Sequence, residues 1–492
     1  MARRMAVVDE PASPVPLAER PSPRGAAPVS AIVLAAGQGV RMRSRLPKVL
    51  HAVAGRPMIN HVVAAMADLE PRPSPLAVVV GPDSDAIRDA VVTARPDLAM
   101  VFPIQAAPRG TGHAALQAAE AVAGRAGTVL VACGDAPLLG AADFRALLDQ
   151  HDATGDAITV LTAALANATG YGRVVRSAGG TVAAIVEEAD ADAAQRAITE
   201  VNTGAYAFRD AWLWPALAAL APAKSGELYL TDLVARAIAE GETVGALRAA
   251  DHEVGLGINT RAALARAESA MRHRIRERHL AAGVTLVDPE TTWIDAEAEI
   301  GQDTVVWPGT HVLGATRIGR DCRIGPNAVL RDARLGDRVT VTCSVVEDAE
   351  IGDASDVGPY AHLRAGTRLA AGVHVGNFAE IKNSTLATGV RFGHFGYLGD
   401  ATIGRDANIG AGTVTCNFDG RDKHPTTVGA HAFIGSDTML VAPVRVGDRA
   451  RTGAGSVVTR DVPADATVVG VPARPIRSAA APDASSRAQD PA

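Results

Sequence analysis

Ile318-Gly-Arg-Asp-Cys-Arg-Ile324-Gly-Pro-Asn-Ala-Val-Leu330 carries a branched apolar residue at every sixth position. The same period recurs through the last two-fifths of the chain, and glycine often follows the apolar residue. The other members of the series are Ile300, Val306, Val312, Ile351, Val357, Leu363, Leu369, Val375, Ile381, Val428, Ile434, Leu440, Val446, Thr452 and Val458. A period of six fits neither a helix nor a simple alternating strand, but it is typical of very short parallel strands wound into a coil. It predicts a left-handed parallel β-helix of hexapeptide repeats over residues 283–477.

The first half of the chain alternates apolar, strand-like runs with alanine-rich, helix-like runs. We expect strands over residues 30–34, 76–80, 128–132 and 157–161, and a helix over residues 112–121. This alternation predicts an α/β domain over residues 29–259, Rossmann-like, with a mixed, mostly parallel sheet and helices on both faces. Ligands of such sheets bind beyond the carboxyl ends of the strands.

Three segments lie outside these two patterns. Residues 260–282 are predicted to form a charged helical linker, whose thin apolar face favours solvation over contact with a membrane. Residues 1–28 and 478–492 are predicted to be disordered extensions. Arg3-Arg4 is not followed by the apolar stretch of an export signal. No run reaches the roughly 18 apolar residues of a membrane helix.

Composition limits the partners and the compartment. The net charge of −6 gives no basic footprint, so nucleic acid is not an expected partner. Cys133, Cys322, Cys343 and Cys416 lack the spacing of a metal site or a disulfide framework. Free thiols in a reducing, cytoplasmic location are the simplest interpretation.

A glycine-bearing loop follows the first expected strand. Gly37 and Gly39 let backbone N–H groups approach phosphate oxygens, and Arg41 and Lys48 supply positive charge nearby. An ordinary strand-to-helix turn is an equally good interpretation of such a loop on its own.

Two further loops carry candidate ligands. Asp135 follows an apolar strand, where it suits a Mg²⁺ ion bridging nucleotide phosphates, although helix capping explains it equally well. Gln105 and the small residues Gly110 and Thr111 suit the reading of a base edge, or a plain loop that leads into a helix.

The β-helix by itself indicates no chemistry, so its interruptions matter. The period fails at a polar insert over residues 415–427 and is locally irregular over residues 392–399. His394 lies in the second of these. Acetyl transfer to an amine needs a base with a pKa near neutral, but a lone histidine in a repeat protein is more often a surface residue.

In their order and joint occurrence these segments resemble the family of bifunctional N-acetylglucosamine-1-phosphate uridyltransferase/glucosamine-1-phosphate N-acetyltransferases. The resemblance covers about residues 29–475. It implies a nucleotide-sugar pyrophosphorylase domain followed by an acetyltransferase β-helix, and a homotrimer. The matching segments are residues 34–42, 47–48, 105, 110–114, 134–138, 171–173, 185–187, 202–204, 226–232, 259 and 393–400.

For the first domain the resemblance implies transfer of uridylyl from UTP to N-acetylglucosamine-1-phosphate, with release of pyrophosphate. Arg41 and Lys48 would stabilise the reacting phosphorus, and Asp135 and Asn259 would coordinate Mg²⁺. The implied nucleotide and sugar contacts are Leu34, Ala35, Ala36, Gly37, Lys48, Gln105, Gly110, Thr111, Cys133, Gly134, Asp135, Gly172, Glu187, Asn202 and Asn259.

For the β-helix the resemblance implies acetylation of glucosamine-1-phosphate by acetyl-CoA, with His394 as general base. The implied contacts to the amino-sugar phosphate are Arg364, Lys382, Tyr397 and Asn408. The implied contacts to acetyl-CoA are Ala411, Asn417, Phe418, Ser436 and Ala454. The product would supply precursors of peptidoglycan and the cell envelope.

Three positions depart from the family pattern. Val40 stands where a hydroxyl residue is usual, Phe418 stands where tyrosine is usual, and the coil ends in residues 470–475 without the usual basic residue.

Two other functions fit the sequence less well. One is a single-activity pyrophosphorylase whose β-helix only regulates or oligomerises, and His394, Lys382 and the insert at residues 417–423 argue against it. The other is a scaffold without catalysis. A scaffold would be expected to lose phosphate-loop or metal-ligand residues, yet all of these are present, namely Gly37, Arg41, Lys48, Asp135 and Asn259.

Overall fold

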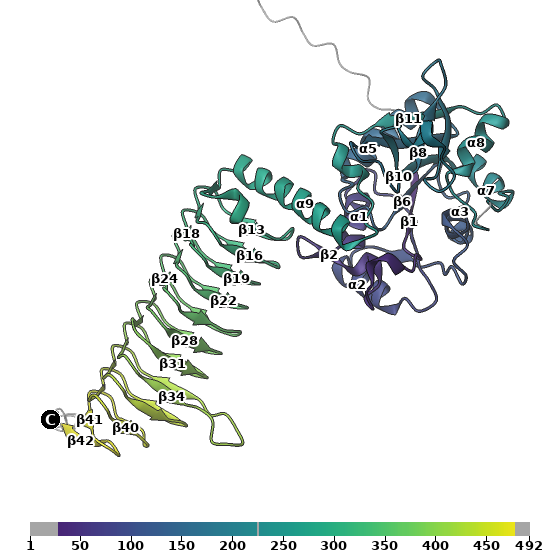
Figure 1. Ribbon diagram of the computed structural model, residues 1–492. Helices are drawn as coiled ribbons and strands as arrows, with labels where there is room; N and C mark the ends of the chain where they lie inside the picture. Colours follow the sequence, from purple (N-terminus) through teal and green to yellow (C-terminus); the bar gives the residue numbers. More distant parts are fainter. Residues whose placement is uncertain (1–27, 224–225, 478–492) are drawn as a thin grey trace, which may run out of the picture.

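The computed structural model describes residues 28–223 and 226–477, and it consists of an α/β domain, a long helix and a β-helix (Figure 1). The extensions predicted to be disordered, residues 1–28 and 478–492, lie outside the described residues, except for Pro28. None of the helices in the described part of the chain combines the length and the hydropathy needed to cross a bilayer.

The α/β domain is built on a mixed sheet with the strand order β11-β7-β10-β6-β1-β4-β5. β10 runs antiparallel to β6 and β7, and the other neighbours along this order are parallel. β8 and β9 form an antiparallel pair beside β10. The strands are β1 (Val29–Leu34), β4 (Leu76–Val79), β5 (Met100–Val101), β6 (Thr128–Cys133), β7 (Ile158–Ala164), β8 (Arg173–Arg176), β9 (Val182–Val186), β10 (Glu200–Arg209) and β11 (Val244–Arg248).

Helices cover both faces of this sheet. Ala31 and Val33 of β1 belong to one apolar core, and Ile32 and Leu34 belong to the other. Successive side chains of a strand point to opposite faces, so a strand that is covered on both sides is apolar throughout. The helices are α1 (Met58–Ala67), α2 (Asp85–Ala94), α3 (Thr111–Leu116), α4 (Ala119–Val122), α5 (Ala141–Thr154), α6 (Ala193–Arg196), α7 (Asp210–Ala218) and α8 (Asp232–Ala239).

The continuous helix expected over residues 112–121 is wrong, because the structure divides it into α3 and α4. Between them the backbone N–H groups bond to the carbonyl three residues earlier, as in a 3₁₀ turn. These bonds run from Ala118 N to Ala115 O and from Ala121 N to Ala118 O. The side chain of Gln117 donates to His113 O at 3.1 Å at the same point. Alanine-rich sequence gives no sign of this local tightening.

The helix α9 (Arg261–Ala281) connects the two domains (Figure 1). The Thr260 hydroxyl caps its first turn by accepting from Ala263 N at 3.1 Å. Ala263, Ala267 and Ala270 recur on one side and pack with apolar residues of the α/β domain, whereas Ile275 belongs to the core of the β-helix. The two ends of one helix therefore pack on different domains.

The β-helix has three faces, each of which is a sheet of short, mostly parallel strands. Its coils are stacked below α9 in Figure 1. In the described residues the first face runs from β12 (Thr285–Leu286) to β42 (Arg474–Arg477), with β42 antiparallel to its neighbour. The second runs from β13 (Trp293–Ile294) to β40 (Val457–Val458), and the third from β14 (Glu299–Ile300) to β38 (Val444–Val446). The residues of the six-residue series are buried along the axis, which confirms the predicted fold.

Candidate active sites

Two adjoining cavities open at the carboxyl ends of β1 and β6. The first has a volume of about 510 Å³ and the second about 330 Å³. The first is lined by ten of the implied contacts, which are Leu34, Ala35, Ala36, Gly37, Lys48, Gln105, Gly110, Thr111, Cys133 and Asp135. The second adds Gly172, Glu187, Asn202 and Asn259, and Arg41 lines both. The fold thus brings together residues that lie more than 200 positions apart in the sequence.

The sheet explains why these residues meet. Leu34 and Cys133 are paired at the ends of two parallel strands. Gly134 lies outside the cavity walls, and its N–H donates to Leu34 O at 2.9 Å. Because a Cβ at Gly134 would lie only 3.2 Å from that same oxygen, the residue permits a close approach of the two strand ends. Val40 is 78% exposed and lines neither cavity.

Lys48 lies where the two cavities meet. Its ammonium group is paired with the Asp135 carboxylate, and it donates to Asn259 Oδ1 at 3.0 Å. The side chains of Lys48 and Asp135 are only 13% and 15% exposed, so the charges are partly shielded from water. Two oxygen ligands and one cation therefore converge on a single point of the cavity wall.

The oxygens of Asp135 and Asn259 fit a divalent cation that is shared with a phosphate. Mg²⁺ in nucleotide sites takes one or two protein oxygens, several waters and oxygens of the substrate. Among the described residues there is no cluster of three or more His, Cys, Asp or Glu side chains that could enclose a metal. The donors suit an ion that arrives with a nucleotide, not one held in a cage of protein ligands.

Polar contacts fix the side of the first cavity that contains Gln105 and Gly110. The Gln105 amide donates to Gly110 O and lies 3.0 Å from His113 Nδ1. Gly110 has a φ of 94°, and a Cβ there would lie 2.5 Å from Leu228 O, so only glycine fits this crossing. The Thr111 hydroxyl accepts from Leu230 N at 3.0 Å and ties the loop to the following segment.

The second cavity carries the groups suited to sugar hydroxyls. Burial raises the pKa of Glu187, and a hydrogen bond from the Thr231 hydroxyl at 3.0 Å partly opposes that shift. The Asn202 amide donates to the Tyr206 hydroxyl at 2.5 Å and accepts from Gly204 N at 2.9 Å. Hydrogen bonds within the protein thus hold the side chains of Glu187 and Asn202 in place.

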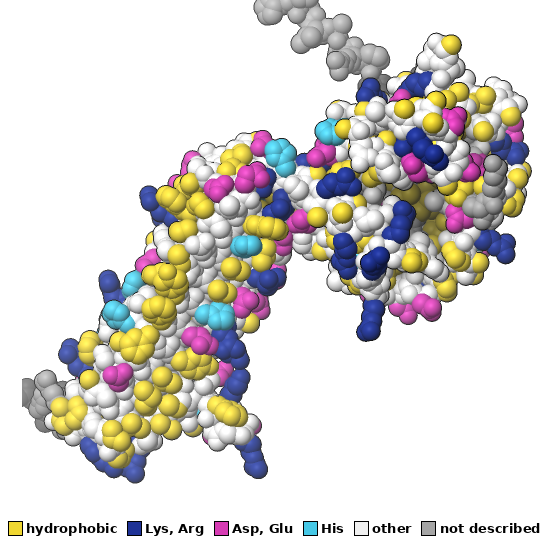
Figure 2. All heavy atoms as spheres, in the orientation of Figure 1, with side chains coloured by type: hydrophobic (Ala, Val, Ile, Leu, Met, Phe, Trp, Pro, Cys, Tyr) yellow, Lys and Arg dark blue, Asp and Glu magenta, His cyan; other side chains and the backbone are white. Residues whose placement is uncertain are grey.

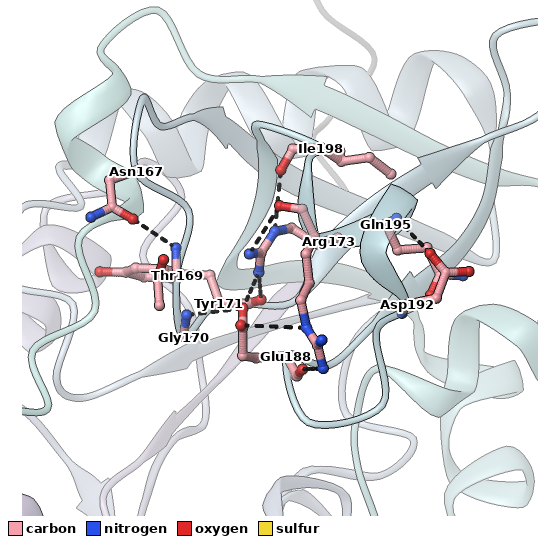
Figure 3. Close-up of polar contacts among 10 residues, drawn as sticks. Asn167, Thr169, Gly170, Tyr171, Arg173, Glu188, Asp192, Gln195 and Ile198 are labelled. Atoms are coloured by element: carbon pink, nitrogen blue, oxygen red, sulfur yellow. Dashed lines mark hydrogen bonds and ion pairs between the residues drawn. The ribbon is translucent and has the colours of Figure 1, made fainter.

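Arg173 follows Gly172 in the sequence, and Figure 3 shows its polar contacts with Tyr171, Glu188 and Ile198. Its guanidinium is 2% exposed, forms an ion pair with Glu188 at 2.8 Å, and donates to Ile198 O at 3.1 Å. The Glu188 carboxylate also accepts from Gly170 N at 3.1 Å. The buried arginine thereby ties the loop before Gly172 to the segment that carries Glu187.

Cys133 lines both cavities, and its environment decides its chemistry. Burial raises the pKa of its thiol to about 12. The neutral thiol is a poor nucleophile, so Cys133 contributes a wall of the site and no thiolate chemistry.

Several lining residues were missed as site residues by the sequence interpretation. They are Tyr206, Thr203, Gly204, Tyr229, Leu230 and Thr231. Residues 226–232 and 202–204 were recognised as family segments, but spacing gave no reason to place Thr231 beside Glu187, 44 positions earlier. These residues are identified as part of the site by their positions in the folded domain, where they line the second cavity.

On the β-helix, four of the implied residues form one column. Arg391, Asn408, Phe433 and Arg451 are register partners in successive coils of the first face. Three residues after each of them come His394, Ala411, Ser436 and Ala454, which therefore occupy the same corner of successive coils. His394 is exposed at one end of a column that otherwise has small side chains. Such a corner can accept an extended, thin ligand.

A group of cations lies on the second face. Arg364 follows β25 (His362–Leu363) and pairs with Glu380 at 2.6 Å, and Lys382 ends the next strand, β28 (Ala379–Lys382). A contact with Lys423, together with the charges of Lys423 and Arg364, lowers the pKa of Lys382. Tyr397 in β31 (Gly396–Gly399) is the register partner of Glu380. Lys423, which sequence analysis did not single out, completes this group.

Lys423 comes from the polar insert, which forms a projecting loop between β34 (Val414–Cys416) and β35 (Thr426–Val428) (Figure 1). In Figure 2 the loop stands out from the lower part of the β-helix. Asn417 is 7% exposed and its amide donates to Asp400 Oδ2 at 2.5 Å, whereas Phe418 is 59% exposed. The base of the loop is therefore anchored, and its aromatic ring is free to contact another molecule.

An exposed aromatic row continues from His394. Tyr360, Phe378 and Phe395 are 59%, 60% and 55% exposed, and the rings of Tyr360 and Phe378 stack with centroids 5.4 Å apart. A contiguous group of exposed apolar side chains usually marks an interaction surface, whereas single exposed ones are common in any protein.

The chain is similar to known transferases over nearly its whole length. Residues 30–295 match the nucleotidyl transferase family, and residues 297–332 and 425–460 match the bacterial transferase hexapeptide (six repeats) family. The bifunctional protein GlmU of Streptomyces avermitilis is 47% identical over 439 residues, which are 89% of this chain and 90% of that protein. The proteins of the same name from Heliobacterium modesticaldum and Exiguobacterium sibiricum are 48% and 44% identical, over 89% and 88% of this chain and 95% of each relative.

Proposed function

Because the chain belongs to the GlmU family of bifunctional proteins, we propose that it makes UDP-N-acetylglucosamine in two reactions. The β-helix acetylates glucosamine-1-phosphate with acetyl-CoA, and the α/β domain joins the product to the uridylyl group of UTP. The observation that carries this proposal is the position of Lys48, between Asp135 and Asn259, at the junction of a nucleotide-sized and a sugar-sized cavity.

In the uridylyl transfer, an oxygen of the sugar phosphate attacks the α-phosphorus of UTP. A new P–O bond forms as the bond to the β-phosphate oxygen breaks, and pyrophosphate leaves with the electron pair. The nucleophile is already an anion, so the protein contributes positioning and positive charge and needs no base. Lys48 and Arg41 provide this charge. Glu187 and Asn202 orient the sugar, and Gln105 and Gly110 orient the uracil.

Magnesium would be held by Asp135 and Asn259 together with the phosphates. When bound, it neutralises the charge that develops on the phosphate oxygens. The Lys48 ammonium donates to Asp135 Oδ2 and to Asn259 Oδ1. It can therefore turn toward a phosphate and still remain next to the two metal ligands.

In the acetyl transfer, the amine of glucosamine-1-phosphate attacks the thioester carbonyl of acetyl-CoA. His394 accepts the proton that the amine loses, the C–S bond breaks, and the CoA thiolate takes up a proton as it leaves. Arg364, Lys382 and Lys423 supply the charge that a sugar phosphate requires, and Tyr397 lies on the same face. Asn408 lies on the first face, in the coil that follows His394. Ala411, Asn417, Phe418, Ser436 and Ala454 contact the CoA arm.

The acetyl-transfer groups lie on exposed faces, which provide only one wall of a pocket. We therefore include a homotrimer in the proposal, with a second copy closing the site against the column at His394. The aromatic row and the projecting insert are the surfaces that support it. Synthesis in the cytoplasm, and use of the product for peptidoglycan and other envelope polymers, complete the proposed role.

The test measures the two reactions separately in the same preparation. With glucosamine-1-phosphate, acetyl-CoA, UTP and Mg²⁺, the wild-type protein should release both free thiol and pyrophosphate. His394→Ala should lose thiol release, yet it should still release pyrophosphate when N-acetylglucosamine-1-phosphate is supplied. His374→Ala is a matched control, because His374 lies on the first face, in the coil before the one that carries His394, and is also partly exposed.

Each outcome decides between the candidate functions. Thiol release that survives in His394→Ala contradicts the role of that residue. Pyrophosphate without any thiol release in the wild type favours a single-activity pyrophosphorylase with an oligomerising β-helix. Turnover with ATP or dTTP in place of UTP contradicts the uridyl specificity.

A further inference from the structure

The two residues that converge on the phosphate and metal position each lead into an element that touches the β-helix. Lys48 begins the short turn η2 (Lys48–Leu50), and after His51 the chain forms the hairpin of β2 (Ala52–Val53) and β3 (Arg56–Pro57). Asn259 lies two residues before α9. Both segments therefore extend from the uridylyl-transfer site to the other domain.

The tip of this hairpin is held between α9 and the first coil. Ala54 N donates to Glu268 Oε2 at 2.7 Å, and Ala54 O accepts from Ala296 N at 2.9 Å. Ala54 is 1% exposed and belongs to the apolar core that also contains Val284 and Ile294 of the β-helix. A residue of the α/β domain is thus built into the end of the coil.

The neighbouring contacts leave the tip no room to shift. A Cβ at Gly55 would lie 2.3 Å from Asp295 Oδ2, and Gly55 has a φ of 77°. The Asp295 carboxylate is itself held by Gly314 N at 2.8 Å. Beside it, Arg56 Nε donates to Glu297 Oε1 at 3.2 Å.

Backbone hydrogen bonds connect the base of the hairpin to Lys48. Met58 N donates to His51 O at 3.0 Å, and His51 N donates to Lys48 O at 3.2 Å. The His51 ring in turn receives Arg261 Nη1, from the first residue of α9, at 3.2 Å. The short hairpin of β2 and β3 and the hydrogen bonds at its two ends therefore connect the first coil to the backbone of Lys48. The contact between His51 and Arg261 extends this connection to the start of the helix that follows Asn259.

We propose that the contact between the hairpin tip and the first coil positions Lys48 and Asn259 for uridylyl transfer, so that Gly55 and Glu268 are positioning residues of that reaction. Neither residue lines the two cavities. The β-helix then serves the α/β domain as a support, in addition to carrying its own site. The inference rests on the proposed uridyltransferase function.

The test places a methyl group against Asp295 in the full-length protein. Gly55→Ala should lower kcat for pyrophosphate release by about tenfold to a hundredfold, because displacements near 1 Å at a reacting group have effects of that size. It should also weaken the binding of UTP measured by isothermal titration calorimetry without metal, because Lys48 is displaced. Thiol release and its KM should stay at the wild-type values, which shows that the β-helix is folded.

Two further variants separate positioning from a general loss of stability. Adding Asp295→Ala to Gly55→Ala removes the clash and should restore most of the lost kcat and UTP affinity. Gly124→Ala is the matched control, because Gly124 has a φ of 70° in the same domain and nothing lies within 4 Å of an added Cβ. Glu268→Ala should reproduce the loss, whereas Glu268→Gln, which keeps an acceptor for Ala54 N, should retain activity.

The inference is contradicted if Gly55→Ala keeps wild-type kcat and UTP affinity. It is equally contradicted if Gly124→Ala causes the same loss, or if Asp295→Ala does not reverse the loss. Failure of the wild-type protein to release pyrophosphate is a different result, because it contradicts the proposed function itself.

Discussion

Glu187 shows how much the folded surroundings of a single residue alter its chemistry. Burial raises its pKa from the ordinary value of 4.5, while the hydrogen bond from Thr231 opposes the change. As the pH falls, Glu187 is therefore protonated at a higher pH than an exposed glutamate. Protonation removes the charged acceptor that we propose for the sugar hydroxyls.

We expect the KM for N-acetylglucosamine-1-phosphate to rise as the pH falls from neutral toward the raised pKa of Glu187. A fall in pH should therefore weaken the binding of the sugar phosphate, whereas it should stabilise the folded protein. Because the folded-state pKa lies above the unfolded value, the stabilisation is present below the unfolded pKa and is lost as the pH rises through the folded pKa. Glu187→Gln should flatten the pH profile of KM. A profile identical to that of the wild type would exclude Glu187 as the titrating group.

Lys48 should be the most sensitive single position of the uridylyl-transfer site. Lys48→Ala removes the cation between Asp135 and Asn259, and we expect pyrophosphate release to fall by about 10²–10³-fold, the range seen when one preorganised charge-stabilising donor is removed. Thiol release should be unchanged. Arg43→Ala, at an exposed position in neither cavity wall, is the control and should remain near wild type. Retention of activity by Lys48→Ala would contradict the proposed role.

At the scale of elements, the strands follow from sequence more closely than the short helices do. The apolar runs at residues 30–34 and 128–132 became β1 and β6, because a strand buried on both faces must be apolar along its length. The alanine-rich run at residues 112–121 was not one helix, because hydrogen bonding around Gln117 decides the break and composition does not.

The coil that carries His394 depends on one large side chain. Phe392 is fully buried in a core that is otherwise aliphatic in this region. Phe392→Ala should lower the free energy of unfolding of the β-helix by about 3–5 kcal/mol, the usual cost of such a cavity. Acetyl transfer should be lost before uridylyl transfer on addition of urea. Phe433→Ala, at a ring that is 47% exposed, should cost far less and serves as the control.

At the scale of the whole molecule, the proposal requires a trimer. Light scattering after size exclusion should give a mass near three times 50.5 kDa. Phe378→Asp places a charge in the exposed aromatic row and should yield smaller species that lose thiol release but keep pyrophosphate release. Ile238→Asp, at a residue of α8 that is 41% exposed, should leave the mass unchanged. A monomeric wild type with full thiol release would refute the trimer.

The sequence by itself determined the β-helix, the strands of the α/β domain and the family, because these depend on periods and motifs that are local in the chain. The tertiary structure alone decided which distant residues meet. Lys48 reaches Asp135 and Asn259 across 87 and 211 positions, and Lys423 reaches Lys382 only because the insert folds back on its coil. The same holds for Ala54, which joins the core of the other domain. Such contacts depend on how whole elements pack, and no local pattern of residues encodes that packing.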